Sequence, residues 1–104
     1  MKHEIFAVYD SKAAAYLPPF IMHKDEMAIR VFADCINDNG HQFGKNPADY
    51  TLFNIGDYDD NNGTVKHQTK ISLGNGIEFV IPFGDLSQTL IYEDPPVGDL
   101  KKVS

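Results

Sequence analysis

Cysteine, tryptophan and positive charge are scarce in this sequence. One cysteine among 104 residues cannot form an internal disulfide, and it leaves too few thiolates for a cysteine-based zinc site. Lys and Arg number 9 against 15 Asp and Glu, which gives a formal net charge of −6. Because phosphates are neutralised by a cationic surface, this balance argues against a protein that coats nucleic acid with a uniformly basic exterior. The charge balance does not exclude a local basic surface on an otherwise acidic protein.

Long hydrophobic runs are absent as well. The longest apolar stretch, residues 77–83, is interrupted by Glu78 and Pro82 and is far shorter than the ~20 residues that span a bilayer. The first residues lack the apolar core of a signal peptide, since Asp10 and Lys12 follow at once. We therefore expect no membrane partner and a cytoplasmic location, which agrees with the lone cysteine.

What is present is the composition of an ordinary globular chain, with 42% hydrophobic and 12% aromatic residues. A chain of this length corresponds to one domain. The composition changes at Gly84, after which Pro95, Pro96 and several acidic residues follow. We expect a single α+β domain over residues 1–83 and an acidic, proline-containing tail over residues 84–104.

Hydrophobic periodicity predicts one helix and several strands. Apolar side chains at three- and four-residue spacing indicate an amphipathic helix over residues 25–38. The Asn62-Gly63 pair predicts a tight hairpin turn, and Phe20–Met22 is a candidate for a short edge strand after two prolines. The main strands are expected over residues 4–9, 51–58, 64–73 and 77–83.

These elements predict a small antiparallel sheet of about four strands with one amphipathic helix packed across it. An OB-like barrel is the alternative, favoured by the strand content and opposed by a long helix so early in the chain. The expected core residues are Phe6, Val8, Val31, Phe32, Cys35, Phe53, Ile55, Ile71 and Phe79.

The acidic residues around Asp57 do not form a calcium loop. A loop of the EF-hand type starting there would need Gly at position 62 and Glu at position 68, where the sequence has Asn62 and Gln68. The Gly74–Gly76 turn lacks the lysine and the following helix of a phosphate-binding loop. The cluster near Asp57 is therefore interpreted as a solvated hairpin turn.

Cys35 is the single thiol of the chain and thus the candidate for a cysteine nucleophile or a zinc ligand. It lies on the apolar stripe of the predicted helix, so we expect a buried structural thiol rather than a zinc ligand grouped with Asp38 and His41. No local signature supports a Cys–His nucleophile pair. We predict that the protein is no enzyme and has no catalytic residue, metal site or cofactor.

The remaining candidate functional residues are cationic and aromatic. Single-stranded nucleic acid is bound by cations along its backbone and by rings under its bases. On a regular strand, positions 66, 68 and 70 point the same way, about 7 Å apart, which is comparable to the spacing of successive phosphates. A solvated strand face is the alternative interpretation. The candidate DNA-binding residues are Lys12, Tyr16, Arg30, Phe43, Lys45, Tyr50, Lys66, Gln68 and Lys70.

Several segments in the same order resemble one known family. They are Ser11–Phe20, Met27–Phe32, His41–Phe53 and Ile55–Asp60, and the resemblance covers residues 3–80. The chain is similar to the small nonstructural protein of gokushoviruses, which are Microviridae bacteriophages with circular single-stranded DNA genomes. The resemblance implies a protein made in the infected bacterium that acts at the switch from duplex replication to single-stranded genome synthesis and packaging. It brings no catalytic residues.

Two functional hypotheses follow. In the first, the protein binds single-stranded DNA. In the second, it regulates phage replication or capsid proteins without binding DNA directly. Residues 1–80 carry 7 Lys and Arg against 11 Asp and Glu, so DNA binding needs lysines segregated on one face. We also expect a twofold homodimer, because a domain of this size has a limited core. Phe20–Met22 and the segment near Val80 are the candidate pairing edges.

Overall fold

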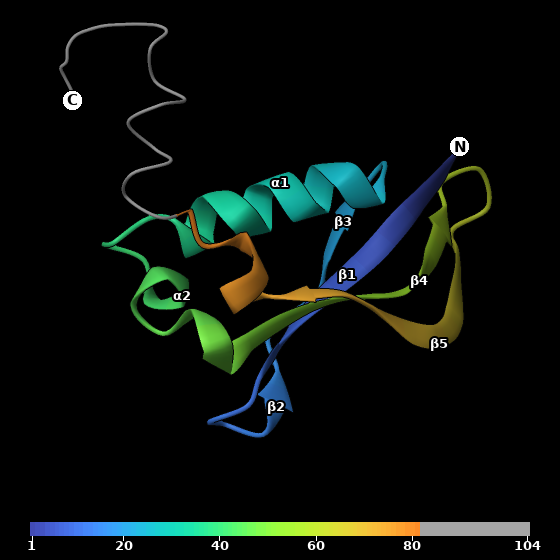
Figure 1. Cartoon of the computed structure of the whole chain (residues 1–104). Coiled ribbons are helices and arrows are strands. Elements are labelled where there is room, and N and C mark those ends of the chain that lie inside the picture. Colours follow the sequence, from blue (N-terminus) through green and yellow to red (C-terminus); the bar gives the residue numbers. More distant parts are fainter. Residues whose placement is uncertain (82–104) are drawn as a thin grey trace, which may run out of the picture.

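Five antiparallel strands form one sheet in a computed structural model that describes residues 1–81 (Figure 1). The spatial order is β2-β1-β4-β5, and β3 also pairs with β1. The sheet is not closed into a barrel, so the α+β prediction is confirmed and the OB-like alternative is wrong. The strands are β1 Lys2–Asp10, β2 Ala15–Tyr16, β3 Phe20–Met22, β4 Tyr50–Asp59 and β5 Thr64–Asn75.

β1 is the central strand. It pairs with β4 along its whole length. Along its other edge it pairs with β2 at Tyr9 and Asp10, and with β3 at residues 4–6. Pro18 and Pro19 separate β2 from β3, because proline has no N–H for a strand ladder. The predicted edge strand Phe20–Met22 is confirmed as β3.

The predicted hairpin is confirmed as β4 and β5, which pair antiparallel. At the turn Gly63 has φ 73°, a left-handed conformation that glycine adopts without steric cost.

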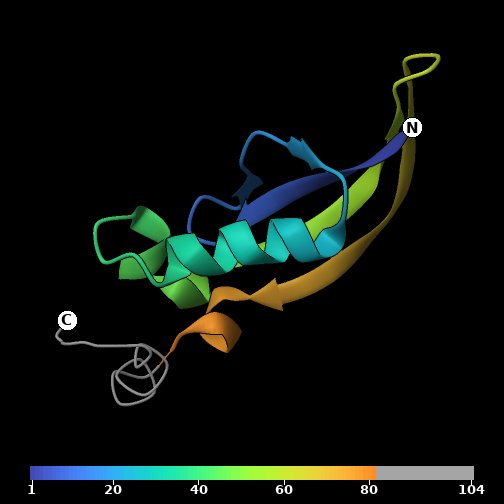
Figure 2. The same cartoon turned by 90° about the horizontal axis from the view of Figure 1, so that it is seen from above.

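Helix α1, Asp25–Ile36, lies across one face of the sheet (Figures 1 and 2). Its buried side chains, Ala28, Phe32 and Ile36, recur every four residues and form the stripe that faces the strands. The helix ends two residues before the predicted limit, because the Asn37 side-chain amide donates to the carbonyl of Ala33 at 2.9 Å and to that of Phe79 at 2.9 Å. These bonds join the end of α1 to a distant segment.

Three short helices close one end of this layer. They are α2 Gln42–Lys45 and the 3-10 helices η1 Pro47–Asp49 and η2 Gly76–Phe79. Phe43 of α2 packs against Phe32 and Tyr50, with ring centroids 5.7 and 4.4 Å apart. The strand predicted over residues 77–83 is therefore wrong in its described part, since residues 77–79 belong to η2 and residues 80–81 to no strand.

The core lies between α1 and the sheet and consists of Phe6, Val8, Ala28, Phe32, Ile36, Tyr50 and Leu52. Phe6, Val8 and Phe32 are confirmed as core residues, and Phe79 packs against this cluster. Val31 and Ile71 were wrongly predicted, since they are 42% and 52% exposed. Cys35, Phe53 and Ile55, also predicted in the core, are half-buried.

The tail predicted over residues 84–104, and residues 82–83 of the predicted last strand, lie outside the described residues. Within the described part of the chain, none of the helices is long and apolar enough to cross a membrane.

Candidate nucleic-acid interface

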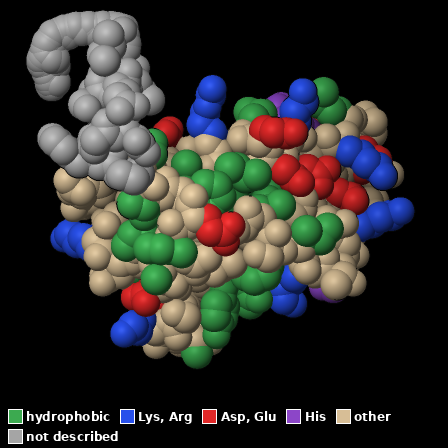
Figure 3. Space-filling view, viewed as in Figure 1, with side chains coloured by type: hydrophobic (Ala, Val, Ile, Leu, Met, Phe, Trp, Pro, Cys, Tyr) green, Lys and Arg blue, Asp and Glu red, His purple; other side chains and the backbone are tan. Residues whose placement is uncertain are grey.

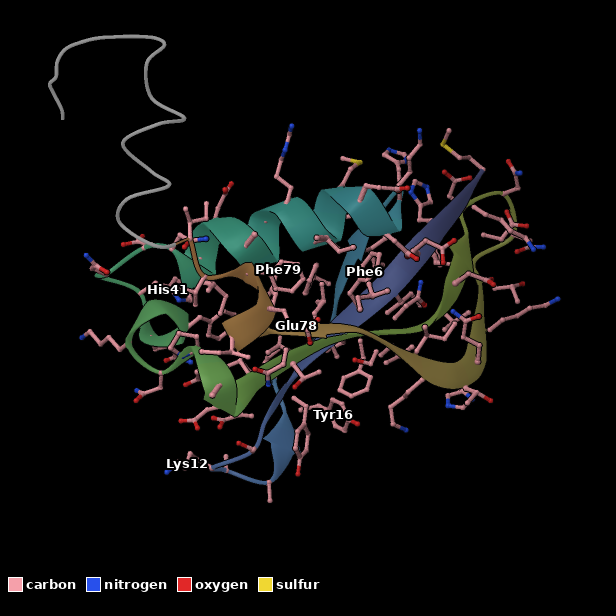
Figure 4. All side chains as sticks on the ribbon, viewed as in Figure 1. Phe6, Lys12, Tyr16, His41, Glu78 and Phe79 are labelled. Carbon is pink, nitrogen blue, oxygen red and sulfur yellow. The ribbon has the colours of Figure 1, made fainter. Side chains whose placement is uncertain are left out.

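The face of the sheet turned away from α1, here called the open face, carries a second group of apolar side chains outside the core cluster. None of the helices described in residues 1–81 covers it (Figure 1). In Figure 4, Phe6 and Phe79 lie between the sheet and α1, whereas Tyr16 and Lys12 lie on the other side of the sheet. The open face comprises Ile5, Ala7, Tyr9, Tyr16, Pro19, Ile21, Phe53, Ile55, Val65, His67 and Lys70.

Two adjoining hollows mark the open face. One has a volume of about 390 Å³ and is lined by Ile5, Pro19, Ile21, Ile55, Val65, Lys66 and His67. The other has a volume of about 260 Å³ and is lined by Ala7, Tyr16, Leu17, Pro19, Ile55, His67 and Lys70. They share Pro19, Ile55 and His67, so together they form one continuous groove across β1, β4 and β5.

An aromatic cluster stands beside the groove. The Tyr16 ring lies 4.9 Å from that of Tyr9 and 5.8 Å from that of Phe53, measured between centroids. Lys70 Nζ lies 5.7 Å from the centre of the Tyr16 ring, within the range of a cation–π contact. Tyr16 is 43% exposed, so part of its side chain is accessible to a ligand.

The side chains that line the two hollows include cations and no carboxylates. Lys66, His67 and Lys70 line the hollows, and no acidic residue does. In Figure 3 green apolar side chains reach the lower edge of the molecule with blue side chains beside them, while red and blue side chains lie together at the upper right. Within residues 1–81, no carboxylate comes within 4.0 Å of a Lys or Arg nitrogen. Lys70 is therefore available to an anionic ligand, whereas Lys66 pairs across the strands with Asp57 and also lines a pocket with Asp57 and Asp59.

The predicted row of Lys66, Gln68 and Lys70 is wrong. The register shifts between Asn54 and Gly56, and Gln68 and Lys70 then lie on opposite faces of β5. Gln68 donates to Asn54 on the side of α1, whereas Lys70 lies over Tyr16 on the open face. Strand alternation alone would have kept them together.

The two predicted stacking residues Phe43 and Tyr50 belong to the helix-covered layer. Tyr50 is only 7% exposed, so its ring cannot stack on a base. Burial, followed by the charges of Asp10 and Asp49, raises the pKa of the Tyr50 phenol. Phe43 is half-buried between Phe32 and Tyr50.

The predicted cations are spread over the molecule. Arg30 is exposed on α1 and Lys45 on α2, both away from the groove. Lys12 is exposed in the turn before β2, on the same side of the sheet as Tyr16 (Figure 4). The structure therefore brings together Tyr16 and Lys70 from the predicted set, with Lys12 on the same side, while Lys66 lines both the groove and the pocket of Asp57 and Asp59.

Sequence reasoning missed most of the groove. Phe53 and Ile55 were assigned to the core, and His67 and Ile21 to no site. One signal was available: residues 4–9 and 51–58 are apolar on both strand faces, whereas the chain contains a single long amphipathic helix. One helix covers one face, so among the described residues the other face has no helix over it.

No metal centre is formed in the part of the chain that the structure describes, where no three His, Cys, Asp or Glu side chains are grouped closely enough to hold an ion. Cys35 stands on α1, and burial, followed by the charges of Asp34 and Asp38, raises the pKa of its thiol. Both effects disfavour the thiolate that binds zinc or attacks a substrate.

Comparison with known proteins yields one family. No curated protein and no solved structure matches the chain. The sequence profile of the family described as Phage ORF5 protein matches residues 3–79, which include all described strands and helices except the first residue of β1. The chain therefore belongs to the Phage ORF5 protein family.

Proposed function

We propose that this phage protein is a nonstructural protein that binds single-stranded DNA through the open face, in the cytoplasm of the infected bacterium. The observation that carries the proposal is the pairing of Lys70 with the half-exposed ring of Tyr16 beside a groove free of carboxylates. Bases stack on Tyr16 and insert toward Phe53, while Lys66, Lys70 and Lys12 contact phosphates. Such contacts tolerate any base, so sequence preference is weak.

The charge of the whole chain does not oppose this proposal. Binding is governed by the local potential at the groove, and the Debye length at physiological ionic strength is about 8 Å. The carboxylates Asp57 and Asp59 line a separate pocket near the hairpin turn together with Lys2 and Lys66, so Lys66 belongs both to this pocket and to the groove. Lys70 lines the groove and not that pocket, so it is the lysine on which DNA binding depends most.

The biological role proposed here rests on the resemblance to gokushovirus proteins of the Microviridae. A protein that holds single strands without sequence preference keeps newly made genome strands from being copied back into duplex. It would act at the switch from duplex replication to single-stranded genome synthesis and packaging.

The test is a titration of labelled single-stranded DNA at two salt concentrations. Tyr16→Ala should lower the affinity by about 1–3 kcal/mol, the usual contribution of one stacked base. Lys70→Glu should lower the affinity and reduce the slope of log K against log salt by about 0.7, because one phosphate contact is lost. Lys45→Glu is the matched control, since it makes the same charge change on α2, outside the open face.

Equal effects of Lys70→Glu and Lys45→Glu would show that only net charge matters and that the open face is not the site. Absence of binding by the wild type at low salt would contradict DNA binding altogether.

A second candidate function is regulation of a phage replication or capsid protein through the same face. It is favoured by the large apolar residues there, since Ile21 is 51% exposed and Val65 is 64% exposed. If this second function is the right one, the wild type binds no DNA at low salt. Val65→Glu then abolishes binding of the protein to its phage partner.

A further inference from the structure

Asn54 is a buried polar residue on the side of the sheet that faces α1, only 3% exposed. Its side-chain amide donates to Glu4 Oε1 at 2.9 Å and to Asp25 Oδ1 at 2.8 Å. Its carbonyl oxygen accepts from the backbone N–H of Gly56 at 3.1 Å and from the side-chain amide of Gln68. Both donors and both lone pairs of Asn54 are thus used, and they connect β1, α1, β4 and β5.

This network coincides with the irregularity in β5. Between the pairs Asn54↔Ile71 and Gly56↔His67, β4 advances two residues while β5 advances four. The two additional residues of β5 form a bulge, in which Gln68 turns toward Asn54 and Lys70 turns toward Tyr16. Without the bulge the two side chains would lie on one face.

We propose that the hydrogen bond from Gln68 to Asn54 positions Lys70 over the ring of Tyr16. Gln68 is then a positioning residue of the DNA site, although it faces away from the groove, and this inference rests on the proposed function. The physical reason is register. A strand without a fixed anchor slips, and a slip by one residue turns each side chain to the other face. Gln68 bound to a fully buried partner is such an anchor.

The first experiment does not depend on DNA. In the wild type the ε-methylene protons of Lys70 should be shifted upfield by the Tyr16 ring current and show contacts with its ring protons in NMR spectra. Gln68→Met keeps the length of the side chain and removes the donor, so these signals should return toward those of a free lysine. Gln42→Met makes the same change at an exposed position on α2 and should leave them unchanged.

The second experiment is a double-mutant cycle on DNA affinity. If Gln68 acts through Lys70, the double variant Gln68→Met with Lys70→Met should bind single-stranded DNA no worse than Lys70→Met alone. Each single change should weaken binding by a similar factor, several-fold at low salt. Additive losses would overturn the inference, because a merely stabilising residue gives additive effects.

An unchanged Lys70 signal in folded Gln68→Met would also overturn it. If that variant does not fold, the test is made on NMR spectra of the wild type. The Gln68 amide protons must show contacts with Asn54, and Lys70 must show contacts with Tyr16. Absence of either set of contacts contradicts the proposal. A wild type that binds no DNA removes the proposed function and leaves the NMR test of Lys70 placement intact.

Discussion

Whether a side chain of α1 is buried depends more on the segments that pack against it than on its spacing along the helix. Ala28, Phe32 and Ile36 face the sheet, whereas Val31 is turned outward and Cys35 lies at the margin of the buried stripe. The Cys35 thiol combines partial burial with two nearby carboxylates, Asp34 and Asp38, so its pKa is raised. A thiol of this kind stays protonated and unreactive at neutral pH.

We therefore expect Cys35 to react with a disulfide reagent at pH 7 more slowly than free cysteine, with the rise in rate displaced to higher pH. Because the folded-state pKa is raised, the associated stability is present below the ordinary pKa of about 8.5 and is lost as the pH rises above it. Denaturant titrations of the wild type at pH 7 and above pH 9 measure this loss.

Cys35→Ala should lower the free energy of unfolding by about 1 kcal/mol and leave DNA affinity unchanged. Zinc bound to the wild type and absent from this variant would show that the thiol is a ligand.

Among the elements, the end of β5 departs furthest from its sequence pattern. Asn75 accepts from the N–H of Ile77 at 3.0 Å, and Glu78 accepts from the N–H of Asn75 at 2.9 Å, which is a capping box. The Asn75 amide also donates to the Ala48 carbonyl at 2.9 Å and to Thr51 Oγ1 at 3.0 Å. These bonds turn an apolar segment into η2 and fix it against η1 and β4.

Asn75→Ala removes the cap and both donated bonds, so it should lower the free energy of unfolding by about 1–2 kcal/mol. Asn75→Asp keeps the capping oxygen and should cost less. Asn61→Ala, in the exposed hairpin turn, is the control and should be near neutral. Thermal or denaturant unfolding measures all three, and equal losses for Asn75→Ala and Asn75→Asp would assign the effect to the lost donors alone.

Across the whole molecule, the sheet has two outer edges. β5 forms one edge, and β2 and β3 form the other beside β1. The predicted pairing strand near Val80 does not exist, since Val80 follows η2. The short strand β3, with Ile21 exposed, is the remaining predicted edge.

We expect two copies to join around a twofold axis, so that light scattering at high micromolar concentration gives twice the chain mass of 11.6 kDa. The mass should fall toward that of one chain on dilution, and Ile21→Lys should shift this transition to higher concentration. A single monomer mass at all concentrations would contradict the dimer.

Local pattern was enough to predict the hairpin, the helix and the central strand. In each case the information lies within a dozen neighbouring residues: the run of β-branched and aromatic residues in β1, the three- and four-residue spacing in α1, and the Asn62-Gly63 turn. Composition likewise predicted that lysines had to be segregated on an acidic protein if DNA is bound.

The tertiary structure decided which aromatic rings remain accessible and which way Lys70 points. Phe43 and Tyr50 are covered because α1 and α2 fold over their face, and Tyr16 is half-exposed because no described helix covers the other. The bulge that separates Gln68 from Lys70 depends on Asn54, which itself is held by Glu4 and Asp25. Such outcomes depend on contacts between segments far apart in the chain, and these contacts leave no periodicity in the sequence.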